Sequence, residues 1–110
     1  MVLAVDKPLH WTSFDVVKKL RARWQLRKVG HAGTLDPLAT GLLIICTGKA
    51  TKSIDQYQAM EKVYQGTLVL GKTTPSIDLE TPFDSTTPWG HLQEQDLLGQ
   101  VPSFTGNLLQ

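Results

Sequence analysis

The chain has 110 residues, of which 41% are hydrophobic and 19% charged, and a formal net charge of +1. This length allows one domain or a part of one. No apolar stretch is long enough to span a membrane and no signal peptide stands at the start, so we expect a cytoplasmic protein without membrane contact. One cysteine and three scattered histidines give no internal disulfide and no metal-ligand spacing, and no nucleotide-binding loop is present, so we expect no metal and no cofactor.

Charge is distributed unevenly along the chain. All eleven lysines and arginines lie within residues 1–72, which carry a net charge of +6, whereas residues 73–110 carry −5. A basic cluster abutting a glycine-rich loop favours a surface that faces a polyanion, although a solvated helix face is the commoner reason for such a run. The cluster consists of Lys18, Lys19, Arg21, Arg23, Arg27 and Lys28.

The first elements follow from local patterns. Residues 2–5 are apolar and predict an edge or starting strand. Thr12 offers a hydroxyl cap with Asp15 three residues later, which predicts the start of a helix. Apolar residues at helical spacing then predict a helix over residues 13–24, with Trp24 in its buried face.

The rest of the chain alternates further strands and helices. The apolar run that begins at Leu42 predicts a buried strand. The later elements are a helix over 51–60, a strand over 62–70, a long loop over 72–90, a short helix over 92–101 and a turn into another strand after Phe104. This order favours an α+β fold over a doubly wound sheet.

The most informative stretch runs from Gly30 to Gly41 and holds one carboxylate, Asp36, between three glycines and a strand. Pro37 biases Asp36 towards an extended conformation, which limits where the carboxylate points. A loop held against a buried strand is a rigid mount for a reactive side chain. The alternative interpretation is that Asp36 caps a turn, which is the usual role of an aspartate beside a proline.

Residues 30–41 resemble the signature G-H-x-G-x-L-D-P-x-A-x-G of the bacterial TruB-type tRNA pseudouridine synthases, with every fixed position filled. Residues 61–64 resemble the K-x-Y strand of that family, and residues 102–110 its F-x-G-x-(I/L)-x-Q segment. Residues 73–81 are similar to its T-x-T-x-D-x-x-G loop, except that Pro75 and Thr81 replace a usual Thr and Gly.

The resemblance implies a mixed, mostly antiparallel sheet flanked by helices, incomplete in this chain. Residues 1–110 would be the N-terminal part of the catalytic domain, with the C-terminal half and an RNA-binding domain absent and this part alone inactive. The complete enzyme would be a monomer that binds the T-arm of tRNA and converts the uridine at position 55 to pseudouridine.

The resemblance also assigns roles to residues. Asp36 would be catalytic, Tyr64 would stack on the flipped base and His31 would enter the RNA, with Gly33, Thr34 and Leu35 also contacting the substrate. The basic cluster would contact RNA phosphates. The alternatives are that Tyr64 is a half-buried strand residue and that His31 bonds the local backbone.

Two other functions stay open at this point. The chain could be a non-catalytic RNA-binding module or an inactive fragment of the same fold, although Asp36 and Tyr64 are both intact. It could instead be a small hydrolase that uses Asp36, but no second acid, base or metal motif supports that function.

Overall fold

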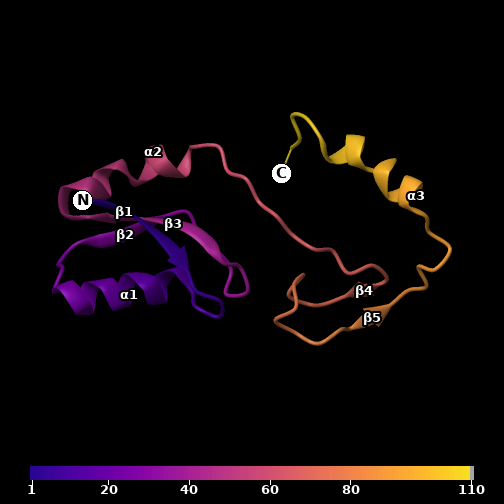
Figure 1. The fold of residues 1–110 in the computed structure, drawn as a ribbon, viewed down its shortest axis with the longest axis horizontal. Helices are drawn as coiled ribbons and strands as arrows, with labels where there is room; N and C mark the ends of the chain where they lie inside the picture. The colour runs from indigo at the N-terminus through magenta and orange to yellow at the C-terminus, as the bar shows by residue number, and fades with distance from the viewer. Residues whose placement is uncertain (110) are drawn as a thin grey trace. The chain divides into compact units, whose positions relative to one another are not determined.

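Three antiparallel strands form the main sheet, in the order β1-β3-β2 (Figure 1). In this computed structural model, which describes residues 1–109, they are β1 (Val2–Lys7), β2 (Val29–Ala32) and β3 (Gly41–Thr47). The apolar run of β3 takes the central place, where strand neighbours on both sides satisfy its backbone. Val2 of β1 pairs with Cys46 and Val29 of β2 pairs with Thr47. The edge position predicted for the first strand is therefore confirmed.

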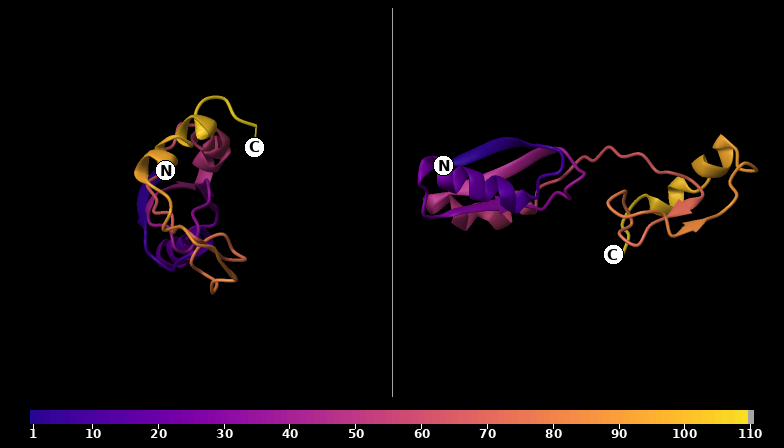
Figure 2. Two further views of the ribbon diagram at one scale, coloured as in Figure 1. Left: turned by 90° about the vertical axis from the view of Figure 1, so that its right-hand side faces the viewer. Right: turned by 90° about the horizontal axis from the view of Figure 1, so that it is seen from below.

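Helices α1 (Ser13–Trp24) and α2 (Ile54–Gln58) lie on opposite sides of this sheet (Figures 1 and 2). A 3₁₀ turn, Gly48–Ser53, leads from β3 into α2. The helix predicted over 13–24 is confirmed at both ends. The helix predicted over 51–60 has an α-helical part of only five residues.

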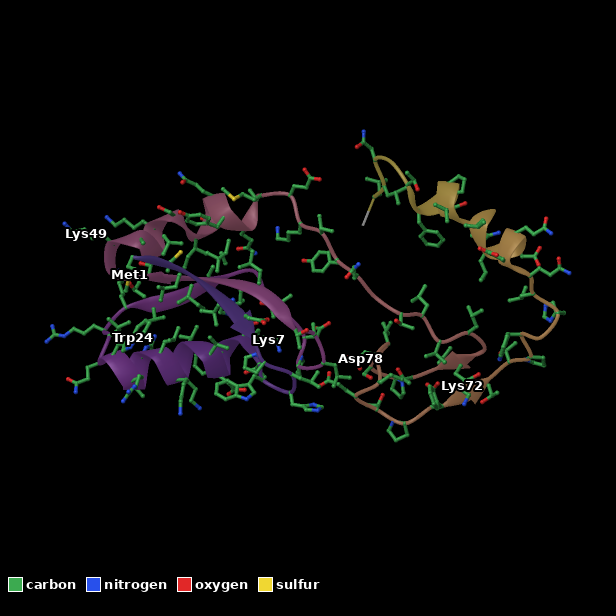
Figure 3. The ribbon with its side chains drawn as sticks, viewed as in Figure 1. Met1, Lys7, Trp24, Lys49, Lys72 and Asp78 are labelled. Atoms are coloured by element: carbon green, nitrogen blue, oxygen red, sulfur yellow. The ribbon has the colours of Figure 1, made fainter. Side chains whose placement is uncertain are left out.

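The core lies between the sheet and α1. It consists of five apolar side chains, each less than 9% exposed: Val16, Val17, Val29, Leu43 and Ile45. Because side chains alternate along a strand, Leu43 and Ile45 face α1 while Leu42 and Ile44 face the side of α2. The prediction that Trp24 belongs to this core is wrong, since Trp24 is 48% exposed at the last residue of α1 (Figure 3).

Two strand assignments differ from the sequence patterns. Strand β2 was not expected, because its four residues contain a glycine and are too few to show an alternating pattern. The strand predicted over 62–70 is wrong. Residues 61–69 have no regular secondary structure, and side chains on both faces of the expected strand are exposed, as Val63 and Tyr64 are. Among residues 1–109 no strand pairs with this segment, so its backbone N–H and C=O groups have no partners in a neighbouring strand.

Residues Met1–Gln65 form one compact unit and Gly66–Gln110 a second. The second unit contains the hairpin β4 (Lys72–Thr73) and β5 (Ser85–Thr86), α3 (Glu94–Leu98) and a 3₁₀ turn, Val101–Phe104. The hairpin lies inside the predicted loop, and α3 is shorter than the predicted helix. No strand follows Phe104 within residues 105–109, and Gln110 lies outside the described residues.

Gly71 shows what the hairpin requires of the residue just before β4. Its φ is +74°, and a Cβ there would lie 2.4 Å from the Thr87 carbonyl oxygen and 2.5 Å from the Trp89 ring. Only glycine fits this close approach. Antiparallel sheets with separate helices confirm the α+β class, and every strand pairing within residues 1–109 is antiparallel.

Candidate active site

Asp36 lies in the loop that joins β2 to β3. The Ala39 N–H donates to the Asp36 carbonyl oxygen at 2.9 Å, which closes a tight turn with Pro37 at its second position. The Asp36 side chain is exposed, and within residues 1–109 its carboxylate has no hydrogen bond and no ion pair. A carboxylate that caps a turn accepts a backbone N–H. The described contacts therefore do not support the capping interpretation, and the carboxylate is open to a ligand.

A buried lysine fixes the backbone of this loop. Lys7, at the end of β1, has 0% of its side chain exposed (Figure 3). Its ammonium donates to the carbonyls of Pro8 at 3.0 Å, of Pro37 at 3.3 Å and of Trp11. The His10 N–H donates to the same Pro37 carbonyl at 2.8 Å. Three carbonyl partners satisfy all three ammonium donors, so the residue after Asp36 is held by a charge-assisted bond.

Ser13 holds the residue before Asp36. Its hydroxyl accepts the Leu35 N–H at 2.9 Å and lies 3.3 Å from the Leu35 carbonyl oxygen, to which it donates. Ser13 is only 2% exposed. Its hydroxyl is available for this contact because Thr12 caps α1, accepting the Asp15 N–H at 3.0 Å. Lys7 and Ser13 thus clamp the loop on both sides of Asp36.

Sequence reasoning gave neither Lys7 nor Ser13 a role. A lysine that ends an apolar strand just before a proline is a usable signal, because a buried ammonium needs several acceptors nearby. Ser13 follows Thr12, which already caps the helix. A second hydroxyl at this point was a signal that Ser13 contacts another segment of the chain.

His31 lies on β2, and its Nδ1 is hydrogen-bonded to the Gly33 carbonyl. Because a carbonyl oxygen only accepts hydrogen bonds, Nδ1 carries the proton in this contact. This contact is the one that the backbone-bonding interpretation of His31 expected. His31 pairs with Ile45, so it shares the sheet face that looks towards α1.

A cavity of about 610 Å³ opens on the other face of the sheet, within the first unit. Its walls come from the β2–β3 loop, β3, the end of α2 and residues 60–65. The cavity brings together four of the predicted substrate-binding residues, Gly33, Thr34, Leu35 and Tyr64, and does not include His31 or Asp36 among its lining residues. Tyr64 is 70% exposed, so its ring is accessible and the half-buried interpretation is wrong.

The six cations of the basic cluster are all exposed. Arg21 donates to the Val29 carbonyl at 3.3 Å, and the Lys18 ammonium lies 5.8 Å from the centre of the Phe14 ring. At about 100° per residue, Lys18 and Lys19 point to different sides of α1, and Arg27 and Lys28 lie beyond the end of the helix, so the cluster does not form one face. None of the six lines the cavity.

Within residues 1–109, no three histidine, cysteine or acidic side chains come together as metal ligands would. In the same part of the chain, no helix has the length and apolar character that crossing a membrane requires.

Residues 21–110 match the family model of the TruB family pseudouridylate synthase, N-terminal domain. The chain belongs to the TruB family. This membership confirms the resemblance of residues 30–41 to the TruB signature. The match also extends beyond that motif, since the matched range covers residues 21–65 of the first unit and all of the second.

Three TruB-family relatives are each named tRNA pseudouridine synthase B. That of Chlorobium chlorochromatii is 50% identical over 113 residues, that of Parabacteroides distasonis 48% over 115 and that of Flavobacterium johnsoniae 50% over 116. Each alignment covers 99% of this chain but only 44%, 49% and 51% of the relative. The chain therefore spans about half the length of the curated relatives that it matches.

One solved structure is also similar, that of an H/ACA RNP bound to a substrate RNA containing 2′-deoxyuridine. It is 40% identical to this chain, with a TM-score of 0.49, over 50% of this chain and 17% of the other.

Proposed function

We propose that this chain is the N-terminal part of a cytoplasmic tRNA pseudouridine synthase that modifies the uridine at position 55 in the T-loop. The observation that carries the proposal is the Asp36 carboxylate. Its loop is held on both sides by Lys7 and Ser13, and within residues 1–109 the carboxylate has no hydrogen-bond or ion-pair partner. Identity of about 50% to proteins named tRNA pseudouridine synthase B supports tRNA as the substrate.

The reaction breaks the N1–C1′ bond of uridine and forms a C5–C1′ bond, while a proton leaves C5 and N1 gains one. No electron is gained or lost, so no redox cofactor is required. A carboxylate is suited to this chemistry because it can attack the sugar or the pyrimidine ring as a nucleophile, or accept the C5 proton as a base. We assign this role to Asp36.

The target base must leave its stack to reach the carboxylate. The cavity beside the Asp36 loop has apolar walls and an exposed tyrosine, Tyr64, on which the base would stack. Gly33, Thr34 and Leu35 would shape the wall nearest to Asp36. His31 would enter the RNA from the loop's other side and help to hold the base out.

The basic cluster around α1 would contact phosphates of the T-arm. Such contacts add affinity without sequence information and weaken with salt. Because the six cations do not form one face, only those on the side nearest to the RNA would contribute at one time.

A second candidate is a non-catalytic RNA-binding module of the same fold. The observation that favours it is that Asp36 does not line the cavity in which the base would stack. Tritium release from tRNA labelled at uridine C5 separates the two candidates, because only the enzyme detaches that proton.

The test uses the protein expressed from its complete reading frame, incubated with bulk tRNA and an excess of chelator. We expect tritium release, with modified uridines mapping to position 55. Modification confined to ribosomal RNA would contradict the substrate. Loss of turnover in EDTA that added zinc restores would contradict the cofactor-free reaction.

A further inference from the structure

Lys62 is the only lysine or arginine that lines the cavity, and Glu61 is the only acidic residue that does so. The two side chains carry opposite charges but form no ion pair with each other. An RNA strand that delivers a base into this cavity also brings a phosphate to its edge, where the Glu61 carboxylate repels it. The cavity therefore needs a cation, and Lys62 is its only candidate.

The structure holds the Lys62 ammonium in a defined position. It donates to the carbonyls of Gln58 at 2.5 Å and of Met60 at 3.0 Å, just where α2 ends. A lysine ammonium has three donors, and within residues 1–109 these two carbonyls are its only acceptors. One N–H remains for a ligand, and the two bonds already made restrict where the charge can lie.

The stem of Lys62 also reaches the loop that carries Asp36. Its Cε lies 4.0 Å from the place that a Cβ on Gly33 would take. Gly33 has a φ of +87°, which few other residues adopt, so the turn of the loop beside the lysine stem favours glycine. Lys62 therefore connects the end of α2 to the loop at the cavity wall.

We propose that Lys62 binds a backbone phosphate of the RNA strand whose uridine enters the cavity. This inference rests on the proposed function, because it presupposes that RNA is the substrate. A compact ammonium with a free donor is a common ligand for phosphate. The competing possibility is that Lys62 only stabilises the end of α2 through its two carbonyl contacts.

The test measures the salt dependence of binding to a labelled RNA hairpin with the sequence of a tRNA T-arm. Lys62→Met keeps a long apolar stem and removes the charge. Loss of one phosphate contact should reduce the slope of log K against log salt by roughly 0.7 to 0.9. The Lys62→Met change should weaken binding to a hairpin of scrambled loop sequence to the same degree. Lys49→Met is the matched control, because Lys49 is exposed, does not line the cavity and lies at the far end of the unit from Lys7 (Figure 3).

A slope equal to that of the Lys49→Met variant would overturn the proposal and leave only the helix-end role. Lysine acetylation read by mass spectrometry decides the matter without a variant. Bound RNA should protect Lys62 and leave Lys49 reactive, and equal reactivity with and without RNA would overturn the proposal. Pseudouridine formation with an unchanged slope would refute Lys62 alone, whereas a reduced slope without pseudouridine would refute the proposed function alone.

Discussion

At the scale of single residues, the site is a carboxylate that the fold leaves open and two buried polar residues that hold its backbone. The constrained loop of Asp36 could be anticipated from the sequence because glycines, a proline and a strand surround it, whereas its catalytic role is what the family resemblance implies. The roles of Lys7 and Ser13 could not be anticipated, because their partners are backbone carbonyls and amides distant in the chain. Backbone groups are present at every residue, so a sequence pattern does not show which ones a side chain will reach.

Ser13→Ala tests the clamp on the residue before Asp36. It leaves the partly buried Leu35 N–H and carbonyl without their partner, which should lower the free energy of unfolding by about 1–3 kcal/mol. In the protein from the complete reading frame we expect kcat to fall more than KM, since the loop positions the carboxylate for the chemical step. Thermal unfolding and steady-state kinetics measure these effects.

Ser53→Ala is the control for Ser13→Ala, because the Ser53 hydroxyl makes no capping hydrogen bond. Its unfolding free energy should stay within about 0.5 kcal/mol of the wild type. A loss of stability in Ser13→Ala with kcat and KM unchanged would mean that Ser13 supports the fold but not the site.

At the scale of elements, sequence prediction succeeded where a local pattern determined the result. The helix over 13–24 has its cap at Thr12, and the apolar run from Leu42 forms β3, as its pattern predicted. Prediction failed where a partner was decisive. β2 exists because β3 pairs with it, and residues 62–70 are not a strand because no strand within 1–109 pairs with them. Trp24 was misplaced because helical spacing gives a direction but not the extent of the sheet beneath it.

The capping box of α1 makes stability depend on pH. A side-chain hydrogen bond with Thr12, and next the Thr12 backbone N–H, hold the pKa of Asp15 below its ordinary value of 3.8. Since the folded pKa is the lower one, this contribution is present above the ordinary value and is lost as the pH falls through the folded pKa. Asp15→Asn, which does not titrate, should therefore show a smaller fall in Tm between about pH 6 and about pH 2.

Asp55→Asn is the control for that experiment, because the Asp55 side chain accepts no hydrogen bond within residues 1–109. Its Tm should follow the wild-type curve across the acid range. Identical acid profiles for Asp15→Asn and the wild type would show that the capping box does not contribute to the pH dependence.

At the scale of the whole molecule, the two units differ in how much they bury. Every buried residue of the described chain lies in the first unit, and none lies within residues 66–109. Large apolar side chains of the second unit are exposed, among them Ile77 at 95% and Phe104 at 77%. Exposed apolar groups of this kind are typical of surfaces that pack against another partner or aggregate.

We therefore expect residues 1–65, expressed alone, to keep the cooperative unfolding of the 110-residue chain. The core of α1, β1, β2 and β3 is complete within them, although a unit of this size is only marginally stable. Thermal unfolding followed by circular dichroism compares the two proteins. A Tm lower by more than about 8 °C, which for a domain of this size corresponds to more than about 1 kcal/mol, would show that residues 66–110 stabilise the first unit.

The most direct test of the central claim is pseudouridine formation by Asp36→Asn in the protein expressed from its complete reading frame. The amide keeps the size and polarity of the side chain but is neither a nucleophile nor a base. We expect tritium release from C5-labelled tRNA to be abolished while tRNA binding and Tm remain those of the wild type. Measurable turnover by the purified Asp36→Asn protein would contradict the assignment of Asp36 as the catalytic carboxylate.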